Sequence, residues 1–130
     1  MKNLFLITCL ILLFSCSQKV EEISTKVEGD SLEAQMIEAY NAGVQAMEQG
    51  DILFATKKFN EAELLFPQSE WAPKASLMAS YTYWKGAYYS NSVNELKRFI
   101  KLYPKNENLS YAYYLLAMNY YDSIVDEKKD

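Results

Sequence analysis

Two cysteines and several acidic side chains are the groups in this 130-residue sequence that could take part in covalent or acid–base chemistry. The sequence contains no histidine, which excludes a histidine-based catalytic triad, histidine metal ligands and imidazole acid–base catalysis. Glu61 and Glu63 are two residues apart and would face different directions on a helix, so we expect solvated charges there and no catalytic pair. We therefore expect a binding module that is not an enzyme, without a metal ion or cofactor.

Cys16 follows an apolar run in the pattern of a covalent attachment site. Residues 4–14 are too few for a membrane-spanning helix, which needs about 20 residues, and they fit the apolar region of a signal peptide. Leu13, Ser15 and Cys16 together resemble the bacterial lipobox, which implies cleavage before Cys16, diacylation of its thiol and acylation of the new N-terminus. Cys9 would be removed with the signal peptide. The alternative is an ordinary secretory signal with an incidental cysteine.

The residues after Cys16 indicate to which membrane the mature chain is sorted. Ser17 stands where an aspartate would, by resemblance to lipoprotein sorting rules, retain the protein in the inner membrane. We therefore expect the outer membrane, on its periplasmic face. Residues 16–30 are polar and charged without a durable apolar stripe, so we expect residues 1–15 as the signal peptide and 16–30 as a lipidated tether.

The composition favours an all-α domain after the tether. Half of the residues are apolar, and 15% are aromatic, which is enough to form a core. With only 4 Gly and 3 Pro there is little turn chemistry for an all-β fold. The net charge of −4 and the lack of a basic cluster argue against nucleic acid as a partner.

An internal repeat of 37 residues organises the sequence from residue 31 onward. Gly43, Ser80 and Ala117 recur at this spacing, as do Pro67 and Pro104. The pattern predicts helices at about 31–49, 52–66, 69–89, 92–103 and 108–125, with turns at 50–51 and 90–91, because proline ends a helix. The units span about 31–67, 68–104 and 105–130, and the third is incomplete.

The residues that recur at this spacing form what we call columns, and these columns have a packing explanation. Gly43 and its equivalents would let the first helix of a unit approach the second, where Ala55 and Ala62 flank Phe59. A column of small residues and a proline at fixed period resembles the tetratricopeptide repeat, whose usual period is about 34 residues. The resemblance implies a solenoid of helical hairpins with about five helices. Trp71 is expected to pack at the turn between the first two units.

A closer resemblance rests on residues 66–104 and 107–130, with SEWA at 69–72 and YAYYL at 111–115. These segments are similar to the BamD (ComL) family of outer-membrane protein assembly lipoproteins. The resemblance implies a component of the β-barrel assembly machinery that binds unfolded outer-membrane proteins and aids their insertion. It implies as partners a BamA-like barrel component, other assembly lipoproteins and, through the lipid on Cys16, the membrane.

The family has about five units, so we expect a truncated chain whose third unit leaves Tyr113, Leu116 and Tyr120 uncovered. Two alternatives remain. One is a generic envelope scaffold, such as a Tol–Pal coordinator or a pilus-assembly lipoprotein. The other is a factor associated with an amidase or glycosidase, for which the sequence offers no catalytic residues.

The first helices of stacked hairpins line a concave face, so their exposed columns predict a peptide-binding groove. Tyrosine and tryptophan offer large contact areas and hydrogen-bonding groups, and methionine adapts its shape to its partner. The family's substrates end in an aromatic residue, which such a groove could hold. The predicted groove residues are Tyr40, Leu77, Tyr81, Trp84, Tyr114, Met118 and Tyr121. The alternative is that these side chains pack between neighbouring helices.

Overall fold

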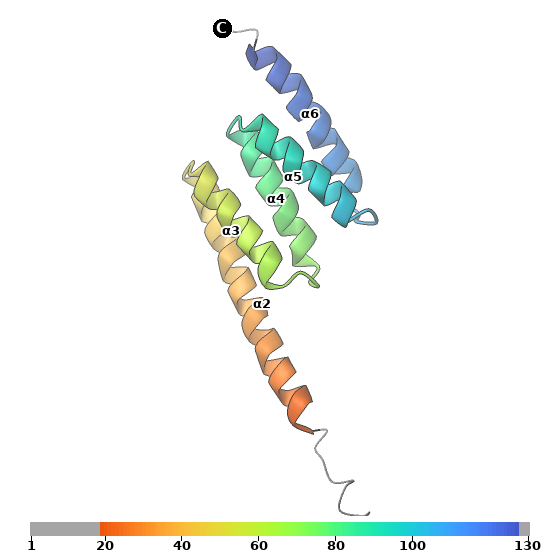
Figure 1. Cartoon of the computed structure of the whole chain (residues 1–130). Coiled ribbons are helices and arrows are strands. Elements are labelled where there is room, and N and C mark those ends of the chain that lie inside the picture. The colour runs from red at the N-terminus through yellow and green to blue at the C-terminus, as the bar shows by residue number, and fades with distance from the viewer. Residues whose placement is uncertain (1–18, 128–130) are drawn as a thin grey trace, which may run out of the picture. The chain divides into compact units, whose positions relative to one another are not determined.

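The computed structural model describes residues 19–127, and side chains within 31–125. These residues form five helices and no strand (Figure 1). The helices are α2 (Lys19–Glu48), α3 (Ile52–Leu65), α4 (Trp71–Lys85), α5 (Tyr89–Leu102) and α6 (Leu109–Glu127). The all-α helical-hairpin architecture expected from the repeat is therefore confirmed, with α2–α3 and α4–α5 as successive hairpins.

The first helix begins earlier than the repeat pattern indicated. A start at about residue 31 was expected, but α2 begins at Lys19. We placed the start of the helix where an apolar stripe begins. Residues without such a stripe can also be helical when their helix propensities are acceptable. Residues 19–30 contain no proline and are rich in Glu, Lys, Val and Ile, which a helix tolerates. Two compact units divide the chain, residues 1–31 and 32–130, and the repeats lie in the second.

The turn and seam of the first hairpin agree with the sequence pattern. Gly50 has φ +81°, which suits glycine, and the side chain of Asp51 accepts a hydrogen bond from the backbone N–H of Phe54 at the start of α3. A Cβ atom on Gly43 would lie 2.9 Å from the ring of Phe59. Phe59, with Ala55 and Ala62 beside it, is fully buried. The small residue at position 43 therefore allows close packing of α2 on α3.

The turn of the second hairpin lies at residues 86–88, so the expected turn at 90–91 is wrong. Gly86 ends α4, and its backbone N–H donates to the carbonyl of Thr82 at 3.1 Å. Ala87 follows with φ +61°. A side chain at Gly86 would lie 2.7 Å from Ile52, so glycine also leaves room for the start of α3. The polar residues at 90–91 instead form the first turn of α5.

The later helices repeat the same packing with different side chains. The hydroxyl of Ser92 donates to the carbonyl of Ser80 at 2.8 Å, which joins α5 to α4 at the predicted small-residue column. Leu96 and Phe99 of α5 are fully buried, and Ala112 and Leu115 of α6 pack in the same cluster with Leu77. The third small residue, Ala117, is exposed on α6.

A buried polar cluster joins the two hairpins. Glu63 on α3 is only 5% exposed, and its carboxylate accepts hydrogen bonds from Arg98 Nη1 at 2.9 Å and from Nη2 at 2.6 Å. The same carboxylate accepts a hydrogen bond from the hydroxyl of Tyr103 at 2.7 Å, and Arg98 also donates to Ser76. The expectation of a solvated charge at Glu63 is therefore wrong, because Arg98 of α5 and Tyr103 just after that helix supply its partners. Glu61 is half-exposed and pairs with Lys58.

This cluster predicts a loss of stability in alkaline solution. Burial and the hydrogen bond to Glu63 raise the pKa of Tyr103 above its ordinary value of about 10. As the pH rises, the unfolded chain loses the Tyr103 proton before the folded chain does. The contribution of this hydroxyl to the free energy of unfolding is therefore complete below about pH 10 and declines as the pH rises further. Urea unfolding at pH 9 and pH 11 should show this decline, and Tyr103→Phe should reduce it. An unchanged pH dependence in the variant would contradict the assignment.

Candidate functional site

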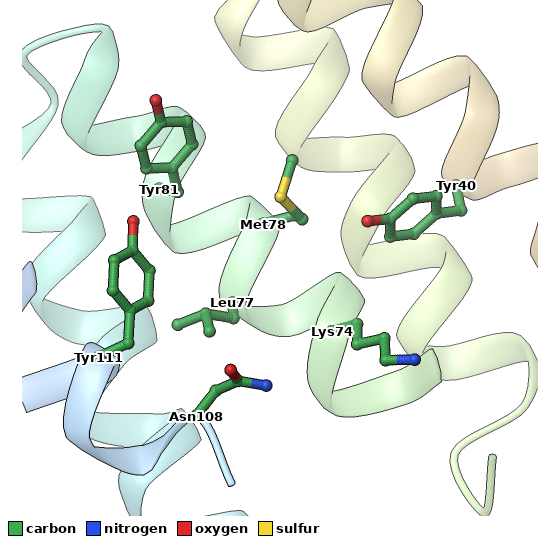
Figure 2. A pocket seen from close by; sticks show the side chains of 7 residues that line it. All are labelled: Tyr40, Lys74, Leu77, Met78, Tyr81, Asn108 and Tyr111. Atoms are coloured by element: carbon green, nitrogen blue, oxygen red, sulfur yellow. The ribbon is translucent and has the colours of Figure 1, made fainter. Parts of the chain in front are cut away.

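An open pocket of about 420 Å³ lies between the first helices of the three units (Figure 2). α4 forms its floor with Leu77 and Met78 and its edges with Lys74 and Tyr81. Tyr40 of α2 lies on one side of Met78, and Tyr111 of α6 lies on the other. Asn108, just before α6, completes the lining. The pocket is thus an apolar floor with polar groups around its rim.

The rim offers hydrogen-bond donors at neutral pH. Burial raises the pKa of Tyr40, and it raises the pKa of Tyr111 with further contributions from Tyr81 and Tyr114. Both hydroxyls can donate a hydrogen bond to a carbonyl. Lys74 supplies the one charge among the lining residues, and its Nζ lies 4.8 Å from the centre of the Trp71 ring. The pocket suits an apolar or aromatic side chain with polar backbone groups beside it.

Three of the seven residues predicted for a groove line this pocket, namely Tyr40, Leu77 and Tyr81. They also contribute to packing between helices. The ring of Tyr40 lies edge-on to Phe59 at 5.3 Å and to Trp71 at 5.4 Å, which agrees with a turn-packing role for Trp71. Leu77 is buried in the core, so only part of it is available to a ligand.

Trp84 lies next to the pocket, outside its lining. Its ring centre is 5.7 Å from that of Tyr81. Its indole N–H donates to Asp122 of α6 at 2.7 Å, so the hydrogen-bonding group expected to meet a peptide already has a partner in the folded chain. Trp84 therefore helps to hold α6 against α4 beside the pocket.

Tyr114, Met118 and Tyr121 lie on α6, and none of them lines the pocket. Tyr114 is 59% exposed and Tyr121 is 64% exposed, whereas Met118 is half-buried. Of the three residues expected to be uncovered on this helix, Tyr113 and Tyr120 are exposed. The third, Leu116, packs against the core.

Four lining residues were not predicted: Lys74, Met78, Asn108 and Tyr111. The 37-residue period contains a signal for two of them, because Lys74 and Tyr111 occupy one column, one helical turn before Leu77 and Tyr114. That column contains a lysine, so a search for aromatic columns does not find it. The contribution of Asn108 depends on how the chain enters α6.

The predicted lipid attachment site, Cys16, and the signal peptide lie outside the described residues. Within residues 19–127, none of the helices has the length and apolar character needed to cross a membrane. In the same part of the chain, no group of three or more acidic or cysteine side chains is placed to hold a metal ion.

Comparison with known proteins relates the repeats to one family. Residues 32–130 match the YfiO family, described as outer membrane lipoproteins. The outer membrane protein assembly factor BamD of Caulobacter vibrioides is 36% identical over 91 residues, covering 70% of this chain and 30% of the relative. BamD of Rickettsia prowazekii is 32% identical over 106 residues, covering 82% of this chain and 42% of the relative.

The chain thus spans between about a third and two fifths of the length of these relatives. No solved structure matches it. The family profile covers most of the chain, including every residue that lines the pocket, and the family description indicates association with the outer membrane. This chain therefore belongs to the YfiO family of outer membrane lipoproteins.

Proposed function

We propose that this chain acts in the assembly of outer-membrane β-barrel proteins and binds their unfolded chains at the pocket between α2, α4 and α6. The name shared by its relatives, outer membrane protein assembly factor, supports the process. The observation that carries the binding site is the pocket itself, which Tyr40, Leu77 and Tyr81 help to line. In this proposal the chain is attached by lipid on Cys16 to the periplasmic face of the outer membrane. Its partners there are a BamA-like barrel component and other assembly lipoproteins.

The pocket chemistry fits an extended peptide with an aromatic side chain. The apolar floor of Leu77 and Met78 would receive the ring, and the flexible thioether can adapt to rings of different size. The protonated hydroxyls of Tyr40 and Tyr111 would donate to peptide carbonyls on either side. Lys74 would attract a carboxylate, which favours acidic or C-terminal segments.

The site can be tested by photo-cross-linking in native membranes. A photo-reactive residue replaces Tyr111, at the pocket rim, and a second chain carries it at Leu64, which is 77% exposed on α3 outside the pocket. Capture of nascent barrel proteins from position 111 and not from 64 is expected. Capture at 111 of Tol–Pal or pilus proteins alone would replace the assembly role with that of a scaffold.

Tyr81→Ala is expected to weaken the binding of a peptide with a C-terminal aromatic residue by about tenfold or more, because aromatic contacts dominate such interfaces. Tyr81 is only partly buried, so the variant should keep its helical circular dichroism. Fluorescence anisotropy with a labelled peptide provides the measurement. Tyr88→Ala is the matched control, since Tyr88 is exposed at the α4–α5 turn outside the pocket. Equal affinities for the two variants would contradict the proposed site.

A further inference from the structure

The second helices of the two complete hairpins, α3 and α5, each have an exposed side that is separate from the pocket. Residues four and seven positions apart lie on one side of a helix. On α3 this exposed side contains Leu53, Lys57 and Leu64. The residues of α5 in the same columns are also exposed, and they are Ser90, Asn94 and Lys101. The two sides therefore belong to one repeated surface of the solenoid.

The exposure of this surface does not depend on the unit that follows. The whole second unit comes after α3, and α4 packs on α3, yet Leu53 is 57% exposed and Leu64 is 77% exposed. The inner residues of α3 face other helices, because Phe59 meets Gly43 of α2 and Glu63 meets Arg98 of α5. The exposed side of α3 is thus an outer surface of the packed repeats and remains uncovered where another unit follows.

The charges on α3 and α5 favour lysine. Together these helices contain five basic and three acidic residues, although the whole chain has a net charge of −4. All three acidic side chains are already in ion pairs, namely Glu61 with Lys58, and Glu63 and Glu95 with Arg98. The remaining cations, Lys57, Lys97 and Lys101, are exposed and form no ion pair with the described part of the chain. This surface therefore offers positive charge without a carboxylate to cancel it.

Exposed apolar side chains beside unpaired lysines suit the surface of an anionic bilayer. Leucine and phenylalanine side chains enter the headgroup region, and a lysine can keep its ammonium group at the lipid phosphates while its aliphatic stem follows them. Phe54, which is 44% exposed, lies next to Leu53 and adds to the apolar part. Each lysine close to an anionic bilayer strengthens binding about fivefold. The match of this chain to a family of outer membrane lipoproteins places such a bilayer within its reach.

We propose that the exposed sides of α3 and α5 form a membrane-contact face that lies against the headgroups of an anionic phospholipid bilayer. The face consists of Leu53, Phe54, Lys57, Leu64, Lys97 and Lys101. None of these residues lines the pocket, so the pocket stays open to a peptide while the face rests on lipid. The contact is independent of the lipid on Cys16, because it depends on the folded repeats alone.

Fluorescence quenching in lipid vesicles tests the contact. Leu64→Cys in the full chain carries an environment-sensitive fluorophore, and the vesicles carry a nitroxide on their headgroups. Quenching at Leu64 should be at least twofold stronger with phosphatidylglycerol in the vesicles than with phosphatidylcholine alone. Ile37→Cys is the matched control, since Ile37 is an apolar residue of α2 that is 41% exposed and lies outside the face. The parent chain sets the labelling background from Cys9 and Cys16.

Removing lysine charges tests the electrostatic part of the contact. Lys57→Gln combined with Lys101→Gln should lower the quenching at Leu64 in anionic vesicles to the level seen in neutral ones. Lys85→Gln combined with Lys105→Gln removes the same charge from exposed positions outside the face and should leave the quenching unchanged. Salt at 1 M should act like the first pair, because it shortens the screening length to about 3 Å. Equal quenching at positions 37 and 64, or quenching at 64 that ignores both lysines, would overturn the inference.

Flotation with neutral vesicles separates this face from the lipid anchor of the proposed function. A chain that floats with neutral vesicles, but gains no quenching at Leu64 in anionic ones, would keep the anchor and overturn the membrane-contact face. A chain that does not float with neutral vesicles, but is quenched at Leu64 in anionic ones, would support the face and refute the anchor.

Discussion

Replacing Arg98 with methionine is expected to lower the free energy of unfolding by about 3–5 kcal/mol, the usual cost of leaving a buried charge without its partner. The Glu63 carboxylate is almost fully buried and accepts two hydrogen bonds from the Arg98 guanidinium. In the variant, only the Tyr103 hydroxyl would remain to satisfy it. Urea denaturation of the two chains at neutral pH measures the difference.

Two further variants distinguish a buried unpaired charge from a general loss of side-chain contacts. Adding Glu63→Leu to Arg98→Met should recover most of the lost stability, because the uncompensated charge is then gone. Lys58→Met is the matched control, since Lys58 pairs with the half-exposed Glu61 and should cost less than about 1 kcal/mol. A double variant as unstable as Arg98→Met alone would show that the charge is not the cause.

Phe59→Ala is expected to destabilise the chain by a similar amount, about 3–5 kcal/mol, because it leaves a cavity in the first hairpin. Phe59 is fully buried and packs on Gly43 and on the ring of Tyr40. Thermal and urea unfolding followed by circular dichroism would measure the loss. The close approach of α2 and α3 at Gly43 leaves little chance that a neighbouring side chain fills the space.

Phe54→Ala on the same helix provides the comparison. Phe54 is 44% exposed, so its removal takes little apolar surface out of the core and should cost far less. Equal losses for Phe54→Ala and Phe59→Ala would contradict the assignment of the seam between α2 and α3.

The repeat period predicted the hairpin packing well because it reports local contacts. Gly43 and Phe59 were placed correctly, since a small residue opposite a large one has a single simple explanation. The helical segment before residue 31 was not predicted, because it has helix-forming residues without an apolar stripe. The turn between α4 and α5 was misplaced, because the turn begins at Gly86 and the more polar residues at 90–91 lie in the first turn of α5.

The site was predicted only in part, for a reason that lies in the geometry between units. Leu77 and Trp84 belong to columns that point away from their own second helix, which suggested an open groove. The structure directs both toward α6, where Leu77 joins the core and Trp84 reaches Asp122. A period in the sequence gives the spacing of units but not the angle between them, and that angle decides whether such a column meets solvent or the next helix. Arg98 and Tyr103, the partners of Glu63, lie 35 and 40 residues from it in the sequence and could not be identified for the same reason.

The pattern of helix contacts has a consequence for how the chain folds. α3 packs on α4, α4 on α5 and α5 on α6, so contacts join neighbours in the sequence, an arrangement that favours rapid folding from any hairpin. Polar links reach further: Glu63 to Arg98 between the hairpins, Thr82 to Met47 between α4 and α2, and Trp84 to Asp122 between α4 and α6. Chains of this kind melt one unit at a time when the coupling between units is weak. These links, together with the apolar clusters in which Ala75 and Ala79 of α4 pack with residues of α2 and α3, couple the units, so we expect them to unfold together.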